Sequence, residues 1–219
     1  MLDIRPGVTA VIGGGGKTTL LRSLGEELAA AGHRVLLCAS TKIFPFEGLE
    51  NLLDPTEAEI AAALAAHGLI CAGKTVPCTG KLTAPVVPMA RLAELADYVL
   101  VEADGSAGRP LKAHAPHEPV IPEEANQTVC VVGASGFGRP IVEAAHRPAL
   151  YAGLAGVPES VPATAETEAA VLLAEGLHSR VYINQAETEE TRAHAAALAA
   201  RLSCPVAAGS LRRKEYFLC

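Results

Sequence analysis

The chain has 219 residues, and its 24 acidic and 18 basic side chains give a formal net charge of −6 at pH 7. This length fits one α/β domain that buries roughly 70% of the surface its unfolded form exposes. The acidic balance argues against a nucleic-acid surface and favours small molecules or proteins as partners. Because no apolar stretch reaches the roughly 18 residues of a membrane helix and the first residues lack a signal-peptide core, we expect a cytoplasmic protein without membrane contact.

Short apolar runs alternate with helical patterns along the whole chain. The runs predict strands at 8–12, 34–39, 98–102, 128–132, 181–184 and 205–208. The patterns predict helices at 18–31, 55–67, 89–96, 164–175 and 188–202, the second with Asp54 as N-cap and Pro55 in its first turn. Apolar runs of this kind are typical of parallel strands covered on both faces. Glycine and proline interrupt the alternation at 68–88, where we expect a small hairpin or an irregular excursion from a single domain spanning 1–219.

The first predicted strand leads directly into a glycine-rich segment, which we call the phosphate loop. Its residues are Gly13, Gly14, Gly15, Gly16, Lys17, Thr18 and Thr19. Consecutive glycines turn backbone N–H groups toward one point, and the following helix adds its unpaired N–H groups and positive dipole end. We predict that all seven residues bind a nucleotide, that Lys17 reaches the β- and γ-phosphates, and that Thr18 binds Mg²⁺.

The phosphate loop departs from the full Walker pattern, because Val11 stands where a glycine is expected five residues before Gly16. A flexible glycine turn beside a surface lysine is the alternative. That alternative does not explain a strand before the loop and a leucine-striped helix after it. The expected fold is therefore α/β and P-loop NTPase-like, with a mostly parallel sheet and helices on both faces.

The strand at 98–102 ends in two carboxylates, Glu102 and Asp104, in a pattern that resembles a Walker B element. A carboxylate at the carboxyl end of such a strand can hold Mg²⁺ through water or orient an attacking water. Being two residues apart, both side chains point to the same face of an unbroken strand. We predict Asp104 as the residue that supports the metal or the water and Glu102 as a further catalytic candidate; a plain turn at Asp104-Gly105 is the alternative.

Two candidates lie at the ends of other predicted strands. Lys42 follows the strand at 34–39, where it can serve the γ-phosphate, the metal or a second substrate, or can lie in solvent at a strand end. Asn184 begins a segment spaced like the base-recognition element of P-loop GTPases, and it can bind a purine edge. Glu187 replaces the aspartate of that element, so ATP and GTP both remain open; it can instead lie at the start of the helix at 188–202.

A long loop at 105–122, rich in glycine and proline, carries further charged residues. Arg109 can neutralise charge that develops during phosphoryl transfer, although a solvated surface cation is the alternative. His114 and His117, with Glu118 beside them, make a poor zinc site, because the loop offers no third or fourth ligand. The six cysteines are scattered and form no Cys-x-x-Cys unit, so they predict neither a disulfide framework nor a structural zinc site.

Several of these segments together resemble the YqeC family. They are the phosphate loop and the stretches at 40–44, 101–112, 117–122, 146–148 and 183–185. The resemblance implies a P-loop NTPase that helps to install or mature the selenium-containing molybdenum cofactor of molybdenum hydroxylases. It also implies that the phosphate loop, Glu102, Asp104 and Gly105 form the nucleotide site, and it favours Arg109 and Lys112 as site residues.

Three functions fit this sequence. The first is an enzyme that hydrolyses a purine nucleotide or transfers its phosphoryl group. The second is a nucleotide-gated chaperone or carrier with little turnover, and the third is a small-molecule kinase. The molybdenum hydroxylase, or an intermediate of its cofactor, is the partner that the resemblance implies.

Overall fold

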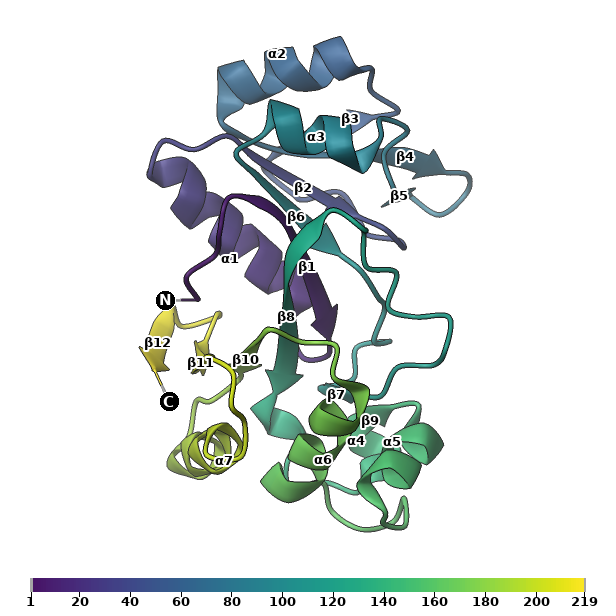
Figure 1. The fold of residues 1–219 in the computed structure, drawn as a ribbon, viewed down its shortest axis with the longest axis vertical. Coiled ribbons are helices and arrows are strands. Elements are labelled where there is room, and N and C mark those ends of the chain that lie inside the picture. The colour runs from purple at the N-terminus through teal and green to yellow at the C-terminus, as the bar shows by residue number, and fades with distance from the viewer. Residues whose placement is uncertain (1, 219) are drawn as a thin grey trace.

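A computed structural model describes residues 2–218 and shows a sheet of ten strands with helices on both faces (Figure 1). The strands are β1 (Gly7–Gly13), β2 (Val35–Ala39), β3 (Glu50–Leu53), β4 (Leu69–Val76), β5 (Lys81–Thr83), β6 (Tyr98–Glu102), β8 (Ala125–Gly133), β10 (Arg180–Asn184), β11 (Val206–Ser210) and β12 (Glu215–Leu218). Their order is β12-β11-β10-β8-β1-β6-β2-β4-β3, and β5 pairs with β4. The pairs are parallel except β11 with β12 and β4 with β5, which confirms the expected mostly parallel sheet.

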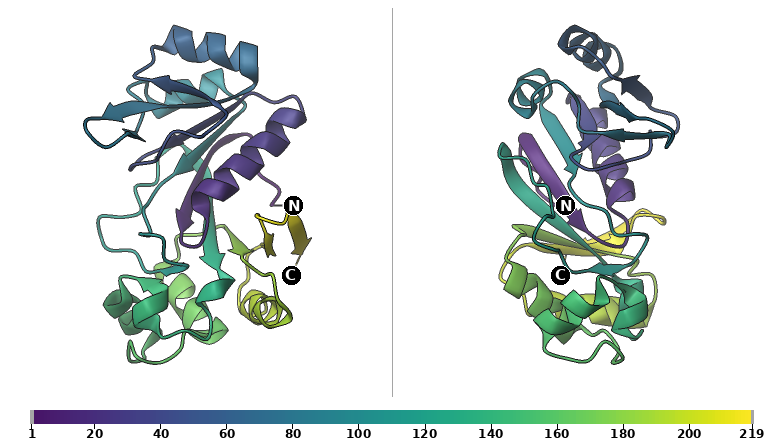
Figure 2. Two further views of the ribbon diagram at one scale, coloured as in Figure 1. Left: turned by 180° about the vertical axis from the view of Figure 1, so that it is seen from behind. Right: turned by 90° about the vertical axis from the view of Figure 1, so that its right-hand side faces the viewer.

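β1 lies in the middle of this order and is buried on both faces, as its continuous apolar run requires. Val11 packs on one face with Leu20, Leu21 and Leu24 of α1 (Lys17–Ala30), while Ile12 packs on the other. Figure 2 shows α1 lying across the sheet when the molecule is seen from behind. The phosphate loop is therefore fixed between a fully buried strand and a helix docked by its leucine stripe.

The other helices are divided between the two ends of the molecule (Figure 1). They are α2 (Glu57–His67), α3 (Met89–Leu95), α4 (Ile141–Ala144), α5 (Pro148–Ala155), α6 (Ala165–Glu175) and α7 (Glu189–Ala199), with the 3₁₀ turn η1 (Ala134–Gly136). α2 and α3 pack on β2, β4 and β6, and α5, α6 and α7 pack near β8, β10 and β11. The short strands β7 (Leu111–Lys112) and β9 (Ala145–His146) pair with each other and tie the loop after β6 to α5.

All six predicted strands and five predicted helices are present, with ends that shift by a few residues. The N-cap of α2 differs from the predicted Asp54. Its N-cap is Thr56, whose hydroxyl accepts the N–H of Glu59, and the Glu59 carboxylate accepts the N–H of Thr56 at 2.7 Å. Asp54 instead has a positive φ of 54° and accepts the hydroxyl of Thr75 at 2.5 Å.

The segment at 68–88 contains both an expected feature and an unexpected one. β4 and β5 form an antiparallel hairpin there, from Lys74 paired with Thr83 to Val76 paired with Lys81. The first half of β4, however, is a buried strand between β2 and β3. The structure also adds β3, β12, α4 and α5, which the sequence did not predict. Among residues 2–218, no helix is long and apolar enough to cross a membrane.

Candidate functional site

The phosphate loop is shaped by positive φ angles and by close backbone neighbours. Gly13, Gly15 and Gly16 have φ values of 94°, 78° and 127°, a region that disfavours residues with a side chain. A Cβ on Gly15 would lie 2.5 Å from the Cα of Gly133, at the end of β8. The N–H of Gly15 donates to the carbonyl of Arg109 at 3.1 Å. These contacts fix the loop against β8 and against the chain that follows β6.

The first turn of α1 faces the open side of the loop. Gly16 is the N-cap, and no side chain caps the helix. The first N–H groups of an α-helix have no partner within the helix, and the helix dipole places partial positive charge there. This end of α1 is therefore able to hold an anion.

Lys17 begins α1 and bends back over the loop. Its ammonium donates to the carbonyl of Gly13 at 2.7 Å and lies 3.3 Å from Oδ1 of Asp104. The other carboxylate oxygen of Asp104 accepts the N–H of Gly13 at 3.1 Å. Lys17 and Asp104 are 4% and 0% exposed, so the lysine is paired inside the protein.

The second carboxylate also reaches the phosphate loop. Glu102, the last residue of β6, accepts the hydroxyl of Thr18 at 2.7 Å. Burial raises the pKa of Glu102 above its ordinary value, although the charge of Lys17 and the Thr18 hydroxyl oppose the rise. Both carboxylates that follow β6 thus lie beside the phosphate loop, one on Thr18 and the other on Lys17.

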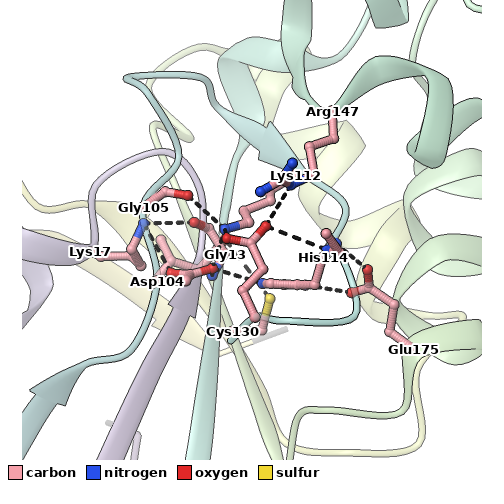
Figure 3. A network of polar contacts seen from close by, with 12 residues as sticks. Gly13, Lys17, Asp104, Gly105, Lys112, His114, Cys130, Arg147 and Glu175 are labelled. Atoms are coloured by element: carbon pink, nitrogen blue, oxygen red, sulfur yellow. Dashed lines mark hydrogen bonds and ion pairs between the residues drawn. The ribbon is translucent and has the colours of Figure 1, made fainter. Parts of the chain in front are cut away.

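Asp104 also belongs to a buried ion cluster that extends away from the loop (Figure 3). Nε2 of His114 lies 2.7 Å from Oδ2 of Asp104, and Nδ1 of His114 lies 2.8 Å from the Glu175 carboxylate. The ammonium of Lys112 lies 2.8 Å from the same Oδ2 of Asp104. Three cationic side chains therefore surround one carboxylate, and α6 contributes its last residue, Glu175, to the cluster.

Lys112 connects the ion cluster to Glu118 and Arg147. Its ammonium donates to the carbonyl of Gly105 at 2.6 Å and lies 3.1 Å from the Glu118 carboxylate. Glu118 accepts in turn from Arg147, the N-cap residue of α5, at 2.7 Å. Lys112 therefore ties the loop at 105–118 to Asp104, just after β6, and Glu118 ties it to α5.

These contacts set the charges of the cluster. Burial raises the pKa of Asp104, but the hydrogen bond from His114 and the charges of Lys17 and Lys112 outweigh burial and lower it to about 2. Burial likewise raises the pKa of Glu118, but Arg147 and Lys112 lower it to about 2. For His114, burial lowers the pKa, yet hydrogen bonds with two carboxylates outweigh burial and raise it. Asp104 is therefore a carboxylate at neutral pH, and the raised pKa of His114 favours the imidazolium, in which both ring N–H groups can donate to the two carboxylates.

Two pockets open on opposite sides of Gly16, and each borders the phosphate loop. The first, the β10 pocket, has a volume of about 490 Å³. It is lined by Gly15, Gly16, Thr19, Ser135, Asn184, Gln185, Glu187, Thr188, Thr191, Leu211 and Arg212. The second, the β2 pocket, has a volume of about 400 Å³. It is lined by Gly16, Lys17, Thr18, Lys42, Ile43, Phe44, Lys81, Glu102 and residues 105–108.

Three predicted site residues remain, namely Lys42, Asn184 and Arg109, and two of them line the pockets. Lys42 lines the β2 pocket, and Asn184 lines the β10 pocket. The Asn184 amide donates to the carbonyl of Gly15 at 2.7 Å and accepts the N–H of Leu211 at 3.1 Å, so it supports the loop directly. The guanidinium of Arg109 donates to the carbonyl of Glu143. In this structure Arg109 contacts the phosphate loop through its backbone carbonyl, and a role for its charge at the phosphates stays a prediction.

Sequence reasoning did not assign the cluster residues His114, Glu118, Arg147 and Glu175 to the site. The sequence predicts a poor zinc site at His114 and His117, with Glu118 beside them. In the described part of the chain no group of three or more His, Cys, Asp or Glu side chains is placed to hold a metal. A signal for two of them was present, because the segments that resemble a family include 117–122 and 146–148. Glu175 gave no signal, since it is the last residue of a helix far along the chain.

Comparisons with known proteins show the family of the chain. The profile of the YqeC family, described as YqeC protein, matches residues 9–149. YqeC of Escherichia coli (strain K12) is 34% identical over 159 residues, which cover 70% of this chain and 62% of that protein. The chain thus spans less than two thirds of that relative's length.

Two solved structures are similar in fold. FtsY from Mycoplasma mycoides has a TM-score of 0.51 at 12% identity, covering 100% of this chain and 65% of that one. The signal recognition particle receptor FtsY from Elizabethkingia anophelis, in complex with GDP, has a TM-score of 0.50 at 13% identity, covering 99% and 61%. At such low identity the likeness concerns the fold alone. The chain belongs to the YqeC family and has a P-loop NTPase-like α/β fold.

Proposed function

We propose that this protein is a cytoplasmic, Mg²⁺-dependent P-loop NTPase that binds a purine nucleotide and acts in maturation of the selenium-containing molybdenum cofactor or of its hydroxylase. The observation that carries the proposal is the position of Lys17 and Thr18. Each lies on the phosphate loop and contacts one carboxylate that follows β6. A nucleotide phosphate chain is the ligand that this combination of loop, lysine and carboxylates suits best.

The nucleotide can be placed by the chemistry of the two pockets. Phosphates suit the N–H groups at the start of α1, and the nucleoside suits the β10 pocket, where amides and hydroxyls predominate. Asn184 and Gln185 line this pocket with Glu187, which accepts the Ser210 hydroxyl at 2.8 Å. We propose a purine because these groups can serve a base edge, and we leave both ATP and GTP as candidates.

The Lys17 ammonium contacts Asp104 and the carbonyl of Gly13, and a phosphate group can replace the Asp104 contact. In the described structure Oδ1 of Asp104 has no hydrogen-bond partner and faces the Lys17 ammonium at 3.3 Å. Asp104 keeps His114, Lys112 and the Gly13 N–H when Lys17 leaves, so its charge stays compensated. We propose that Lys17 exchanges Asp104 for the β- and γ-phosphates.

The residues around Thr18 fit Mg²⁺. Mg²⁺ prefers oxygen ligands and is bound through one or two protein groups together with substrate phosphates. The Thr18 hydroxyl and the Glu102 carboxylate supply such oxygens side by side, whereas Asp104 is already surrounded by three cations. We therefore propose Thr18 and Glu102 as the metal-binding pair, in place of the sequence-based pair of Thr18 and Asp104. Bound there, Mg²⁺ would neutralise charge on the β- and γ-phosphates.

The role in molybdenum enzymes rests on the family to which the chain belongs and on the motifs that carry the resemblance. Two other functions compete with an NTPase. A nucleotide-gated carrier would hydrolyse slowly until its protein partner binds, and a small-molecule kinase would transfer the phosphoryl group to a second substrate. The β2 pocket favours the kinase as the second candidate, since it lies beside the phosphate loop and leaves room for an acceptor.

The proposal is tested by binding and turnover of ATP and GTP with Mg²⁺. Lys17→Ala should lower turnover by roughly 100-fold or more, because it removes the charge meant for the phosphates. Lys74→Ala is the matched control, since Lys74 is exposed on β4 and lines neither pocket. Circular dichroism checks that both variants fold. Unchanged turnover in folded Lys17→Ala would contradict the proposal.

The same assay separates the competing functions. Turnover of the protein alone indicates a hydrolase, and stimulation only by an apo-hydroxylase indicates a carrier. A phosphorylated small product, detected by mass spectrometry, indicates a kinase.

A further inference from the structure

The β2 pocket carries an excess of positive charge. Three of the chain's six lysines line it, namely Lys17, Lys42 and Lys81. Its lining contains one carboxylate, Glu102, which is already hydrogen-bonded to Thr18. A cationic pocket stands out in a chain whose net charge is −6.

Two of these lysines have no carboxylate partner. Among residues 2–218, no ion pair involves Lys42 or Lys81, whereas Lys17 and Lys112 are both paired with Asp104. Unpaired ammonium groups at the wall of a pocket attract a multiply charged anion, and lysine is a frequent partner of phosphate. The charge of the pocket is therefore available to a ligand.

An aromatic ring lies beside Lys81 and lines the same pocket as Lys42. The ammonium of Lys81 sits 4.7 Å from the centroid of the Phe44 ring, and Phe44 is 59% exposed. An exposed phenyl ring at the wall of a pocket favours a ligand with a flat or apolar part. Lys81 lies on β5 and Phe44 follows β2, and the bridge between Ile43 and Leu82 joins these two segments.

The loop at 105–108 forms another part of the pocket lining, and two of its four residues are glycines. Lys112 holds this loop through the carbonyl of Gly105. No atom lies within 4 Å of a Cβ placed on Gly105 or Gly108, so side chains do not fill the space beside this loop. A ligand can therefore lie between the loop and Phe44.

We infer that the β2 pocket binds a second, anionic substrate: a small molecule with a phosphate group that pairs with Lys42 and Lys81 and a flat ring that packs against Phe44. The inference rests on the proposed function, because it assigns the neighbouring phosphate loop to a nucleotide. The two pockets share Gly16, so such a substrate lies beside the end of the nucleotide's phosphate chain. The β10 pocket is lined by one cation, Arg212, and one carboxylate, Glu187, so it offers no such excess of positive charge.

Pyridoxal 5′-phosphate is a suitable probe, because it combines a phosphate, a flat ring and an aldehyde that forms an imine with a nearby lysine. The protein is incubated with saturating ADP and Mg²⁺ and increasing pyridoxal 5′-phosphate, reduced with borohydride, and mapped by peptide mass spectrometry. Lys74 and Lys214 are exposed lysines outside the β2 pocket and serve as internal controls. Pyridoxal without the phosphate is the matched chemical control, and binding of a fluorescent ADP analogue is measured separately.

We expect saturable labelling of Lys42 or Lys81, roughly tenfold or more faster than that of Lys74, because a bound phosphate raises the effective concentration of the aldehyde. Pyridoxal, which lacks the phosphate, should label Lys42, Lys81 and Lys74 at similar rates. Phe44→Ala should raise the half-saturating probe concentration about fivefold, since it removes the ring contact. Lys74→Gln should leave it unchanged.

Two results would overturn the inference. One is equal, non-saturable labelling of all exposed lysines. The other is complete protection of Lys42 and Lys81 by a non-hydrolysable nucleotide triphosphate, which would assign both lysines to the γ-phosphate. If the ADP analogue does not bind while Lys42 and Lys81 are still labelled selectively, the proposed function fails and the anion pocket stands.

Discussion

Lys17 and Asp104 form an ion pair of 3.3 Å in the interior, between the first helix and the end of β6. The pair connects the phosphate loop to the buried ion cluster, because the same carboxylate also contacts His114 and Lys112. A ligand that draws Lys17 away therefore acts directly on the residue that holds the loop at 105–118. This relationship leads to the first two predictions.

Asp104→Asn should strongly destabilise the protein. The substitution removes the charge that compensates Lys112 and His114 in the interior, and breaking a buried pair in this way costs about 3–5 kcal/mol. Urea unfolding followed by circular dichroism measures the loss. Asp97→Asn is the matched control, because Asp97 pairs with Arg34 at 2.8 Å in a partly exposed position, where the loss is smaller than in the interior. Equal losses in the two variants would show that the cluster does not stabilise the fold.

The free energy of unfolding should fall as the pH drops from about 4.5 toward 2. Asp104 and Glu118 both have folded pKa values of about 2, below their ordinary values of 3.8 and 4.5. Their stabilisation is thus complete above the unfolded pKa and disappears as the folded carboxylates take up protons. Asp104 alone accounts for about 2 kcal/mol. Urea unfolding at a series of pH values checks this, and Asp104→Asn should show a shallower acid loss than the unsubstituted protein.

We expect the free energy of unfolding of the unsubstituted protein to fall as the pH rises from about 5 to about 6.5, and we expect Glu168→Gln to remove this fall. Burial raises the pKa of Glu168 from 4.5 to about 8, and in the described structure its Oε2 has no hydrogen-bond partner. Because the folded pKa is raised, the folded state holds a proton that the unfolded state loses above pH 4.5, and stability falls by up to about 1.4 kcal/mol per pH unit. The raised pKa of His114 adds a loss of the same sign only above pH 6.5. An unchanged slope from pH 5 to 6.5 in the variant would rule out Glu168 as its source.

Gly15→Ala should abolish nucleotide binding. The new Cβ would lie 2.5 Å from the backbone of Gly133, at a φ of 78° that already disfavours alanine. Gly80→Ala is the control: Gly80 has a similar φ of 66° and no atom within 4 Å of its Cβ position, so this variant carries the conformational strain without the collision. Titration with a fluorescent ADP analogue compares them. Normal binding by Gly15→Ala would mean that the loop does not hold phosphate in its described shape.

Glu102→Gln should raise the Mg²⁺ concentration for half-maximal turnover by about tenfold or more, because it removes the charged oxygen beside Thr18. Glu26→Gln, an exposed change on α1 in the pair with Arg22, should have no such effect. A Mg²⁺ titration of turnover in both variants decides the assignment. If Asp104→Asn alters the Mg²⁺ dependence and Glu102→Gln does not, the metal belongs with Asp104.

The sequence predicted what depends on local pattern. Strands and helices followed from apolar runs and helical spacing, and the phosphate loop followed from glycines between β1 and α1. Glu102 and Asp104 were predicted to share a strand face; β6 ends at Glu102, yet both carboxylates contact the phosphate loop. β3 and β12 were missed because each has only four residues and lies at an edge of the sheet, where the apolar run is too short to distinguish a strand from a loop.

What each charged side chain contacts was decided by the tertiary structure. Arg109 was expected at the phosphates by its nearness in sequence to Asp104, but its guanidinium bonds with the end of α4. His114 was weighed as a metal ligand, and it bridges Asp104 to Glu175, 61 residues further along the chain. Sequence by itself therefore determined the phosphate loop and the layered α/β fold, because backbone conformation and apolar periodicity are local properties. Only the packing of β6, the loop at 105–118, α5 and α6 decided which charges share the interior, because a buried charge is stable only beside partners that the fold brings to it.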